Sequence, residues 1–460
     1  MSSKSAAVSD SPRKSFVLGH PMKPRRTALV AAATAALVVA SAGVASSQIP
    51  QTDVVLENPA NFTPVLVPSS TVTRPRADAV EQLGSTMYVG GLFTQVQEAD
   101  GTTFSRRNIV AFDAETGAIR PSFNTPISGN VLAIEAANGS LYVGGTFGDV
   151  GGVKRGRVAK IDPVTGEVDA AFNARLGGRV NDIQMLGRGP DAKLLVAGRI
   201  PGQLVALNPN TGANTGYVDL SIADPIPGAN EPLSVHNIAV NPAEDKLVAT
   251  GNFRTVSGQA RSRVFVANLN PGSASLDSWY YPGFAKSCSS TQGNRIAHIW
   301  GVDFSPDGRF FTVAATGQIP ASKADIWPTG ASTYHTVCDA AGRFALADDQ
   351  RPVWINYTGG DTIWDVADTG AAVYVQGHFQ WLDNPYGYAS RCPDGDVCAS
   401  RKGIGAIDPT TGKALPWNPG KPAQQGGKDM LATSSGLWVA SDSLKFNGEA
   451  RRGIAFAPLR

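Results

Sequence analysis

Aromatic and polar side chains stand in front of several short apolar segments, where they could bind a polar ligand. In "VHNIAV", "IWGVDF" and "IWDVAD" they occupy the two positions before a central Ile or Val. Indole faces beside imidazole, amide and carboxylate groups suit a sugar or another small polar ligand. The alternative is that these side chains pack between neighbouring elements and cap strand ends. The residues concerned are His236, Asn237, Trp300, Trp364 and Asp365.

Oxygen-bearing side chains recur at the position just before the central Ile, Val or Met of such segments. Carboxylate and amide oxygens are ligands of hard cations, so Ca²⁺ could bind there and support Lewis-acid chemistry. No Glu occupies this position, however, and the acids are spread over different segments. We therefore predict no cofactor and keep Ca²⁺ as the alternative. The weak Ca²⁺ candidates are Asp182, Asn237, Asp365 and Asp429.

Catalytic motifs are not found in this sequence. It contains no G-x-S-x-G and no H-E-x-x-H, so neither a nucleophile elbow nor a zinc protease site is indicated. We name no catalytic residue and predict a binding protein rather than an enzyme.

Two long insertions are a further place for binding, because long ordered loops on a rigid scaffold often carry it. The first runs from Ile319 to Arg343 and the second from Trp381 to Arg401. Both lie in the part of the chain that carries the two Trp-bearing segments. Tyr386 and Tyr388 of the second insertion are therefore included among the ligand-binding candidates. A rival explanation is that both insertions cover an exposed sheet edge.

The four cysteines predict two disulfides. Outside the cytoplasm an even number of cysteines is normally paired. Of the three pairings, we favour Cys392–Cys398, which closes the loop "CPDGDVC", together with Cys288–Cys338. Zinc binding is not favoured, because no C-x-x-C pair is present.

The elements that must position these residues form a repeat. When the second glycine of each "VGG"-like stretch is placed in register, seven positions align at spacings of 54, 53, 53, 66, 60 and 64 residues. Such a period indicates an array of similar structural units. A short apolar strand precedes each position, and a third and a fourth strand follow it. The aligned positions are Gly91, Gly145, Gly198, Gly251, Gly317, Gly377 and Ser441.

Four short antiparallel strands in each of seven units predict an all-β fold, a seven-bladed β-propeller. The glycines are expected where neighbouring blades approach so closely that a Cβ would collide. The last unit shows only three strands. We therefore predict that residues 58–68, in an N-terminal segment covering 46–76, supply the missing outer strand and close the ring. The propeller domain then covers 77–460.

The first 45 residues have the pattern of a secretory signal. Lys23, Arg25 and Arg26 precede an apolar stretch from Thr27 to Ala45, and Met22 is an alternative start. Without residues 1–45 the chain has 34 basic and 37 acidic residues, a formal charge of −3. We therefore predict a secreted protein of the bacterial cell envelope with no nucleic-acid partner. After cleavage no membrane span remains; a retained anchor is the alternative.

The repeated pattern "LYVGGTF…VGG…R..IA.ID..TG.VD..FN" resembles the delta-sixty repeat β-propeller family, secreted bacterial propellers of unassigned function. The resemblance covers about residues 77–460. The third unit departs from it by lacking the Arg-rich lead to its third strand, and the fifth by a longer insertion. It implies a propeller, an extracellular setting and a binding or scaffold role, and it supplies no catalytic residues.

We therefore expect an exported β-propeller that acts as a binding or scaffold module for polysaccharide or another cell-envelope component. One alternative is a Ca²⁺-dependent propeller hydrolase or lyase with its site at the channel mouth. Another is a structural partner of a second exported protein.

Overall fold

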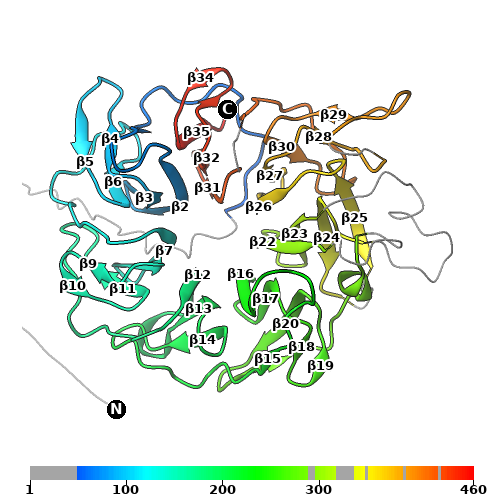
Figure 1. Ribbon diagram of the computed structural model, residues 1–460, viewed down its shortest axis with the longest axis horizontal. Helices are drawn as coiled ribbons and strands as arrows, with labels where there is room; N and C mark the ends of the chain where they lie inside the picture. Colours follow the sequence, from blue (N-terminus) through cyan, green and yellow to red (C-terminus); the bar gives the residue numbers. More distant parts are fainter. Residues whose placement is uncertain (1–48, 289–295, 318–335, 348–350, 387–389, 423–425) are drawn as a thin grey trace, which may run out of the picture. The chain divides into compact units, whose positions relative to one another are not determined.

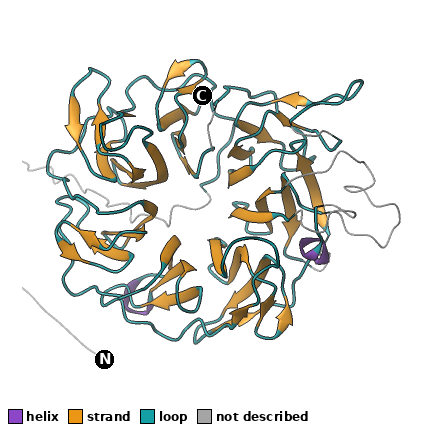
Figure 2. Cartoon of the chain, viewed as in Figure 1, coloured by secondary structure: helices purple, strands orange, loops and turns teal. Residues whose placement is uncertain are grey.

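The computed structural model describes residues 49–460 except 289–295, 318–335, 348–350, 387–389 and 423–425. The predicted signal, residues 1–45, and the candidate Tyr388 lie outside the described residues. Everything below concerns the compact unit from Ala42 to Arg460. The described residues of this unit are all-β, with two short 3₁₀ helices at Gly189–Asp191 and Pro282–Ala285 (Figure 2). No helix among the described residues is long and apolar enough to cross a membrane.

Seven of the antiparallel sheets repeat one strand order along the chain (Figure 1). The inner strands are β2 (Arg76–Leu83), β7 (Val131–Ala137), β12 (Arg179–Leu186), β16 (Ser234–Val240), β22 (His298–Phe304), β26 (Ile363–Asp368) and β31 (Asp429–Thr433). Their partners are β3 (Thr86–Leu92), β8 (Ser140–Gly145), β13 (Lys193–Arg199), β17 (Lys246–Asn252), β23 (Phe310–Thr316), β27 (Val373–Gly377) and β32 (Gly436–Ala440). The third strands are β6 (Ile109–Asp113), β11 (Val158–Ile161), β14 (Leu204–Leu207), β20 (Val264–Leu269), β24 (Ala340–Ala345), β30 (Ile404–Ile407) and β35 (Ile454–Pro458).

The fourth strand is regular in only two of these sheets, as β21 (Ala274–Leu276) and β25 (Pro352–Tyr357). Four other sheets keep a single bridge in its place: Phe112 to Ile119, Ile161 to Val168, Leu207 to Asn214, and Ile407 to Ala414. The other segments contain short strands that pair in small sheets of two or three strands. They are β1 (Val65–Leu66), β4 (Gln95–Gln97), β5 (Thr103–Ser105), β9 (Asp149–Val150), β10 (Val153–Lys154), β15 (Ile222–Ala223), β18 (Thr255–Val256), β19 (Gln259–Ala260), β28 (Trp381–Leu382), β29 (Ala399–Ser400), β33 (Lys445–Phe446) and β34 (Glu449–Ala450).

The N-terminal segment lies against the last sheet without forming the regular strand expected over 58–68. The N–H groups of Leu56 and Ala60 donate to the carbonyls of Pro458 and Phe456 in β35, both at 2.8 Å. The strand that does form in this segment, β1, pairs with β4 instead. Prolines at 59, 64 and 68 explain the irregularity, because each removes a donor from the ladder.

An arginine before the third strand of several sheets bonds a backbone carbonyl, and the position of that carbonyl in the chain differs in the last sheet. In the second sheet Arg155 Nη2 donates to the carbonyl of Asp169 at 3.1 Å, and in the fourth Arg261 Nη2 donates to that of Asp277 at 2.9 Å. Both acceptors follow the third strand of the same sheet. In the last sheet Arg451 Nε donates to Ala60 O at 3.0 Å. Residues near Ala60 thus take the place that a later segment fills in the other sheets.

Apolar clusters hold successive sheets together. Each inner strand contacts the next along the chain, and β31 contacts β2 as well as β26. One cluster therefore combines the first and the last sheets, with Val80 and Phe112 packed beside Leu431 and Trp438. The rings of Phe112 and Trp438 have centroids 5.6 Å apart, and Phe62 of the N-terminal segment packs against the same cluster.

The two glycines of a "VGG" stretch have different neighbours. An added Cβ at Gly145 would lie 2.0 Å from the carbonyl oxygen of Asn130, next to the register shift between Val131 and Ala133 in the same sheet. An added Cβ at Gly144 would lie 2.5 Å from Val180 Cγ1 of the next sheet. The expected close approach between sheets is therefore correct for the first glycine. For the aligned second glycine it is wrong, because a β-bulge of its own sheet fills that space.

Both predicted cysteine pairs lie at disulfide distance. The Cα atoms of Cys288 and Cys338 are 5.8 Å apart, and those of Cys392 and Cys398 are 6.0 Å apart. The first pair is buried in an apolar cluster that also contains Trp279.

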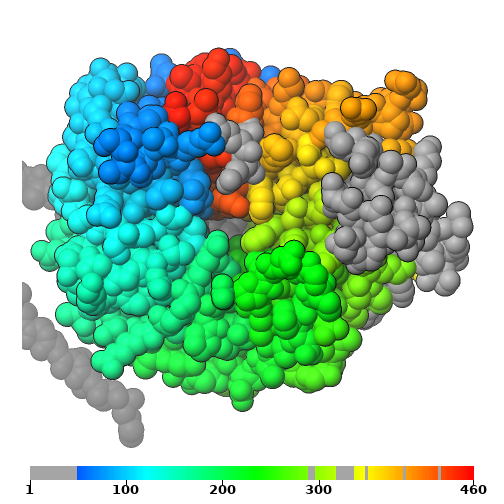
Figure 3. Space-filling model, in the orientation of Figure 1, coloured from blue at the N-terminus to red at the C-terminus, as the bar shows by residue number. Residues whose placement is uncertain are grey.

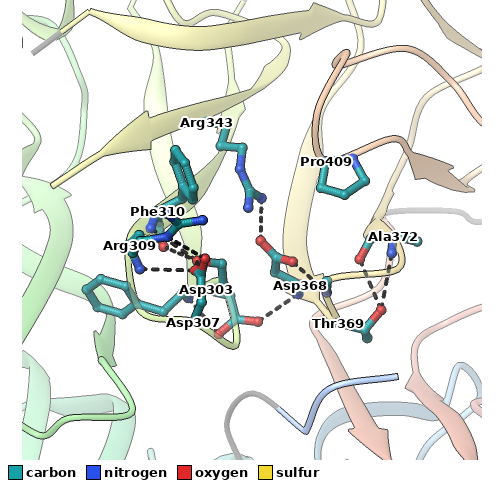
Figure 4. A network of polar contacts seen from close by, with 12 residues as sticks. Asp303, Asp307, Arg309, Phe310, Arg343, Asp368, Thr369, Ala372 and Pro409 are labelled. Atoms are coloured by element: carbon teal, nitrogen blue, oxygen red, sulfur yellow. Dashed lines mark hydrogen bonds and ion pairs between the residues drawn. The ribbon is translucent and has the colours of Figure 1, made fainter. Parts of the chain in front are cut away.

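A buried ion pair joins the fifth and sixth of the repeated sheets (Figure 4). Arg343 of β24 points at the carboxylate of Asp368 in β26, and the backbone N–H of Asp368 donates to Asp303 Oδ2 at 2.8 Å. Arg309 and Asp307, on the turn nearby, form an exposed pair at 2.7 Å. Removing one partner from a buried pair leaves a charge without water or counterion, so the two pairs should differ greatly in their contribution to stability.

We expect Arg343→Met to lower the free energy of unfolding by about 3–5 kcal/mol, because Asp368 is left as a buried unpaired charge. Urea unfolding followed by fluorescence measures this. Arg309→Met is the matched control, with an expected change within about 0.5 kcal/mol. Equal effects of the two variants would contradict the assignment.

We expect Gly145→Ala to destabilise the protein by about 1–3 kcal/mol, because the methyl group would overlap the Asn130 carbonyl. Gly148→Ala is the control, since no atom lies within 4 Å of its added Cβ. Thermal unfolding of both variants checks this. A Gly145→Ala protein as stable as the control would show that the bulge can shift.

Candidate functional site

A cavity of about 400 Å³ lies between the inner strands and is lined by residues from all seven of them. Figure 3 shows the hollow on one face, where parts of the chain distant in sequence meet. The wall includes every residue that stands two positions before the central Ile, Val or Met of an inner strand. These residues are Asp78, Leu132, Asn181, His236, Trp300, Trp364 and Lys428.

Three of the residues one position later, Asp182, Asn237 and Asp429, accept hydrogen bonds from the neighbouring inner strand. Asp182 Oδ2 accepts from the N–H of Ile238 at 2.9 Å, and Asn237 Oδ1 accepts from the N–H of Val302 at 3.0 Å. Asp429 Oδ2 accepts from the N–H of Val80 at 2.7 Å, which links the last sheet to the first. An inner strand is a sheet edge with no further strand beyond it, so these side chains satisfy its outward N–H groups.

A second layer of such bonds lies two residues further along the strands. Glu135 Oε1 accepts from the N–H of Met185 at 3.1 Å, and Gln184 Oε1 accepts from that of Val240 at 3.0 Å. The bond from Asp368 N–H to Asp303 belongs to the same layer. Polar residues at these positions therefore have a structural role between sheets.

Three of the four Ca²⁺ candidates have this structural role. Asp182, Asn237 and Asp429 each give an oxygen to a backbone N–H of the next sheet, and Asn237 Nδ2 also donates to Asp182 Oδ2 at 2.9 Å. Asp365 lies beside Gln376. Within the described ranges, no group of three or more His, Cys, Asp or Glu side chains is arranged to hold a metal ion.

Burial raises the pKa of four acids of the cavity. It raises the pKa of Asp182 and of Asp429 to about 7, against the hydrogen bonds that they accept. It raises the pKa of Glu135 to about 8 and that of Asp365 well above its ordinary value, the latter also through the charge of Asp429. Near neutral pH the cavity therefore carries less negative charge than its composition suggests.

The predicted aromatic residues come together in one cluster. The rings of His236 and Trp300 are stacked with centroids 4.0 Å apart, and those of Trp300 and Trp364 are 5.2 Å apart. Lys428 Nζ lies 3.4 Å from the centre of the Trp364 ring. One indole face is thus covered by His236 and another by Lys428. Side chains of the protein therefore already stack on part of the indole surface that a sugar would contact.

A carboxylate that the sequence did not reveal holds two histidines. Glu231 lies 3.1 Å from His236 Nε2 through Oε1 and 3.2 Å from His298 Nδ1 through Oε2. Burial would raise the pKa of Glu231, but the bonds and charges of the two histidines lower it to about 2. His236 Nδ1 lies 2.8 Å from the carbonyl of Ile299. Glu231 stands in the loop before β16, where no periodic pattern marks it.

Three cations lie at the same end of the cavity. Arg76 Nε bonds both carboxylate oxygens of Asp78 at 3.0 Å. Arg179 and Lys428 are exposed to the cavity, and neither has an ion pair with any residue that the structure describes. Burial lowers the pKa of Lys428 to about 8, against the charges of Asp78 and Asp442, which raise it. Lys428 could have been found from the sequence, because it occupies the same repeat position as Trp300 and Trp364.

The structure places five of the seven ligand-binding candidates in the cavity wall: His236, Asn237, Trp300, Trp364 and Asp365. Tyr386 is exposed on its loop and does not line the cavity.

The raised pKa of Asp182 makes stability depend on pH. An unfolded Asp releases its proton near pH 4, whereas the folded group keeps it to about 7. In that interval the folded state binds more protons, so the free energy of unfolding should fall as pH rises, by at most about 1.4 kcal/mol per pH unit for one group. Asp182→Asn should make this slope shallower in urea titrations. Asp191→Asn, at an exposed turn, should leave it unchanged; equal slopes in all three proteins would contradict the assignment.

Comparison with known proteins does not identify a family. No family model and no curated protein matches the chain. Among solved structures, a match is the crystal structure of the computationally designed Ika8 protein, with 10% sequence identity and a TM-score of 0.44. The match covers 86% of this chain and 98% of that chain. This likeness is too weak to define the fold or the function.

Proposed function

We propose that this chain is an exported seven-bladed β-propeller that binds a polysaccharide or another cell-envelope component in the cavity between its inner strands. Seven sheets of one strand order, with contacts that return from the last to the first, support the propeller. The backbone bonds of Leu56 and Ala60 to β35 support closure of the ring by the N-terminal segment. Membership of the delta-sixty repeat family is part of the proposal and rests on the repeat pattern.

Export is supported by the two cysteine pairs. Disulfides persist in oxidising surroundings, and all four cysteines of the chain lie at bonding distance in pairs. The apolar segment in residues 1–45 agrees with this, as the sequence pattern of a signal.

The binding proposal depends on the cavity-facing positions at which the inner strands of the seven sheets carry different residues. Polar residues at one position of several inner strands, Asp182, Asn237 and Asp429, bond to the neighbouring strand. Residues that differ between the strands, Trp300, Trp364 and Lys428 above all, meet in the cavity wall. A volume of about 400 Å³ is within the range of ligand sites, and aromatic side chains with a few polar groups are typical linings. The hydrolase or lyase alternative has less support, because three of its four Ca²⁺ candidates bond backbone N–H groups.

Glycan-array binding by the wild type and by the double variant Trp300→Ala, Trp364→Ala tests the proposal. We expect the variant to lose at least about tenfold in affinity for the bound glycan, because it removes the wall that fixes Lys428 and His236. EDTA should leave wild-type binding unchanged. Val164→Ala, at an exposed turn, is the control. Unchanged binding by the double variant would refute the site, and loss of binding in EDTA would favour the Ca²⁺ alternative.

A further inference from the structure

The aromatic cluster has few ring faces left for a ligand. His236 is stacked on Trp300 with an angle of 14° between the rings, and His298 lies on the same side of the cluster, 6.1 Å from Trp300. Lys428 Nζ lies 3.4 Å from the Trp364 ring centre and 5.6 Å from that of Trp300. A neutral sugar that stacked on Trp364 would have to displace this ammonium group. The cluster is therefore better built to hold a cation in place than to receive a sugar ring.

The charges around this cluster are not balanced locally. Asp78 is bonded at both oxygens by Arg76, and Glu231 is held between two histidines. Asp78 and Glu231 thus have partners already, and Asp442 is a further acid close enough to Lys428 to affect its pKa. Arg179 and Lys428 remain, with no ion pair to a residue in the described part of the chain. Both are close enough to Asp78 for their charges to affect its pKa, so they belong to one end of the cavity.

The acids deeper in the cavity offset these two cations only in part near neutral pH. Burial raises the pKa of Asp182 and of Asp429 to about 7 and that of Asp365 well above its usual range. Their oxygens also face the backbone N–H groups of neighbouring strands. An anion that enters beside Arg179 and Lys428 would meet two positively charged side chains that have no ion pair with a described residue. Hydrogen bonds between charged groups are stronger than neutral ones, especially in a partly enclosed site.

We propose that the ligand is an acidic saccharide whose oxyanion, a carboxylate or a phosphate, is bound by Arg179 and Lys428. This inference rests on the proposed function and names the ligand class of that site. Trp300 and Trp364 then act as positioning residues, because they fix the ammonium group of Lys428 by cation–π contact. A small saccharide fits the cavity of about 400 Å³ better than a macromolecular anion, and the formal charge of −3 after residue 45 argues against a nucleic acid.

Isothermal titration calorimetry with three probes tests the inference. Trigalacturonic acid carries carboxylates, glucose 6-phosphate carries a phosphate, and maltotriose is neutral. We expect at least one acidic probe to bind about tenfold or more tightly than maltotriose, since a hydrogen bond between charged groups contributes about that factor. The acidic probe that binds more tightly identifies the oxyanion. Equal binding of maltotriose and both acidic probes, or binding of none, would overturn the inference.

Charge variants connect the preference to the site. Lys428→Met and Arg179→Gln should each lower the affinity for the acidic probe about tenfold, whereas Lys428→Arg should keep most of that affinity. Lys445→Met is the matched control, because Lys445 is exposed in β33 and does not line the cavity. If both neutralised variants bind like the wild type, or Lys445→Met weakens binding as much, the oxyanion is not bound here and the inference fails.

The two proposals can fail separately. A neutral glycan from the array that binds the wild type, is lost in the Trp300→Ala, Trp364→Ala protein and is unaffected by Lys428→Met would keep the proposed function and overturn the acidic ligand. An array on which no glycan depends on the two Trp residues would overturn the proposed function itself.

Discussion

The inner strand of each repeated sheet is an edge, and the rest of the structure depends on how its outward N–H groups are satisfied. No further strand is available on that side, and an unpaired buried donor is costly. Side-chain oxygens of the preceding sheet replace the missing strand, as Asp182 does for Ile238 and Asn237 for Val302. The bond from Val80 to Asp429 applies the same solution between the first and last sheets. The same hydrogen bonds thus satisfy the N–H groups of the inner strand and join one sheet to the next.

This structural role limits what the same residues can do chemically. Burial raises the pKa of Asp182 and Asp429, although the backbone hydrogen bonds that they accept lower it. An oxygen held in such a bond has little freedom to coordinate a cation. Chemistry is left to positions whose side chains are not needed between strands. Trp300, Trp364 and Lys428 are such positions, and they form one group because the inner strands bring equivalent residues to the same cavity.

The features that follow from repetition could be predicted from the sequence. The glycine register identified the second strands, and the cysteine spacing identified both pairs that lie at bonding distance. Features that depend on individual side-chain packing could not be predicted. Nothing in the pattern showed that Lys428 covers the Trp364 ring, or that Glu231 reaches two histidines from a loop. The bulge opposite Gly145 could not be predicted, because the sequence does not show whether a glycine is needed for a close contact within its own sheet or for one with the neighbouring sheet.

The bond between Arg451 and Ala60 spans 391 positions of the chain. A polypeptide emerges from the ribosome amino end first. The segment around Ala60 can therefore make this bond only after Arg451 has been synthesised. Early sheets can assemble meanwhile, whereas the contacts of this segment with the last sheet form late. Contacts between residues so far apart in the chain slow folding.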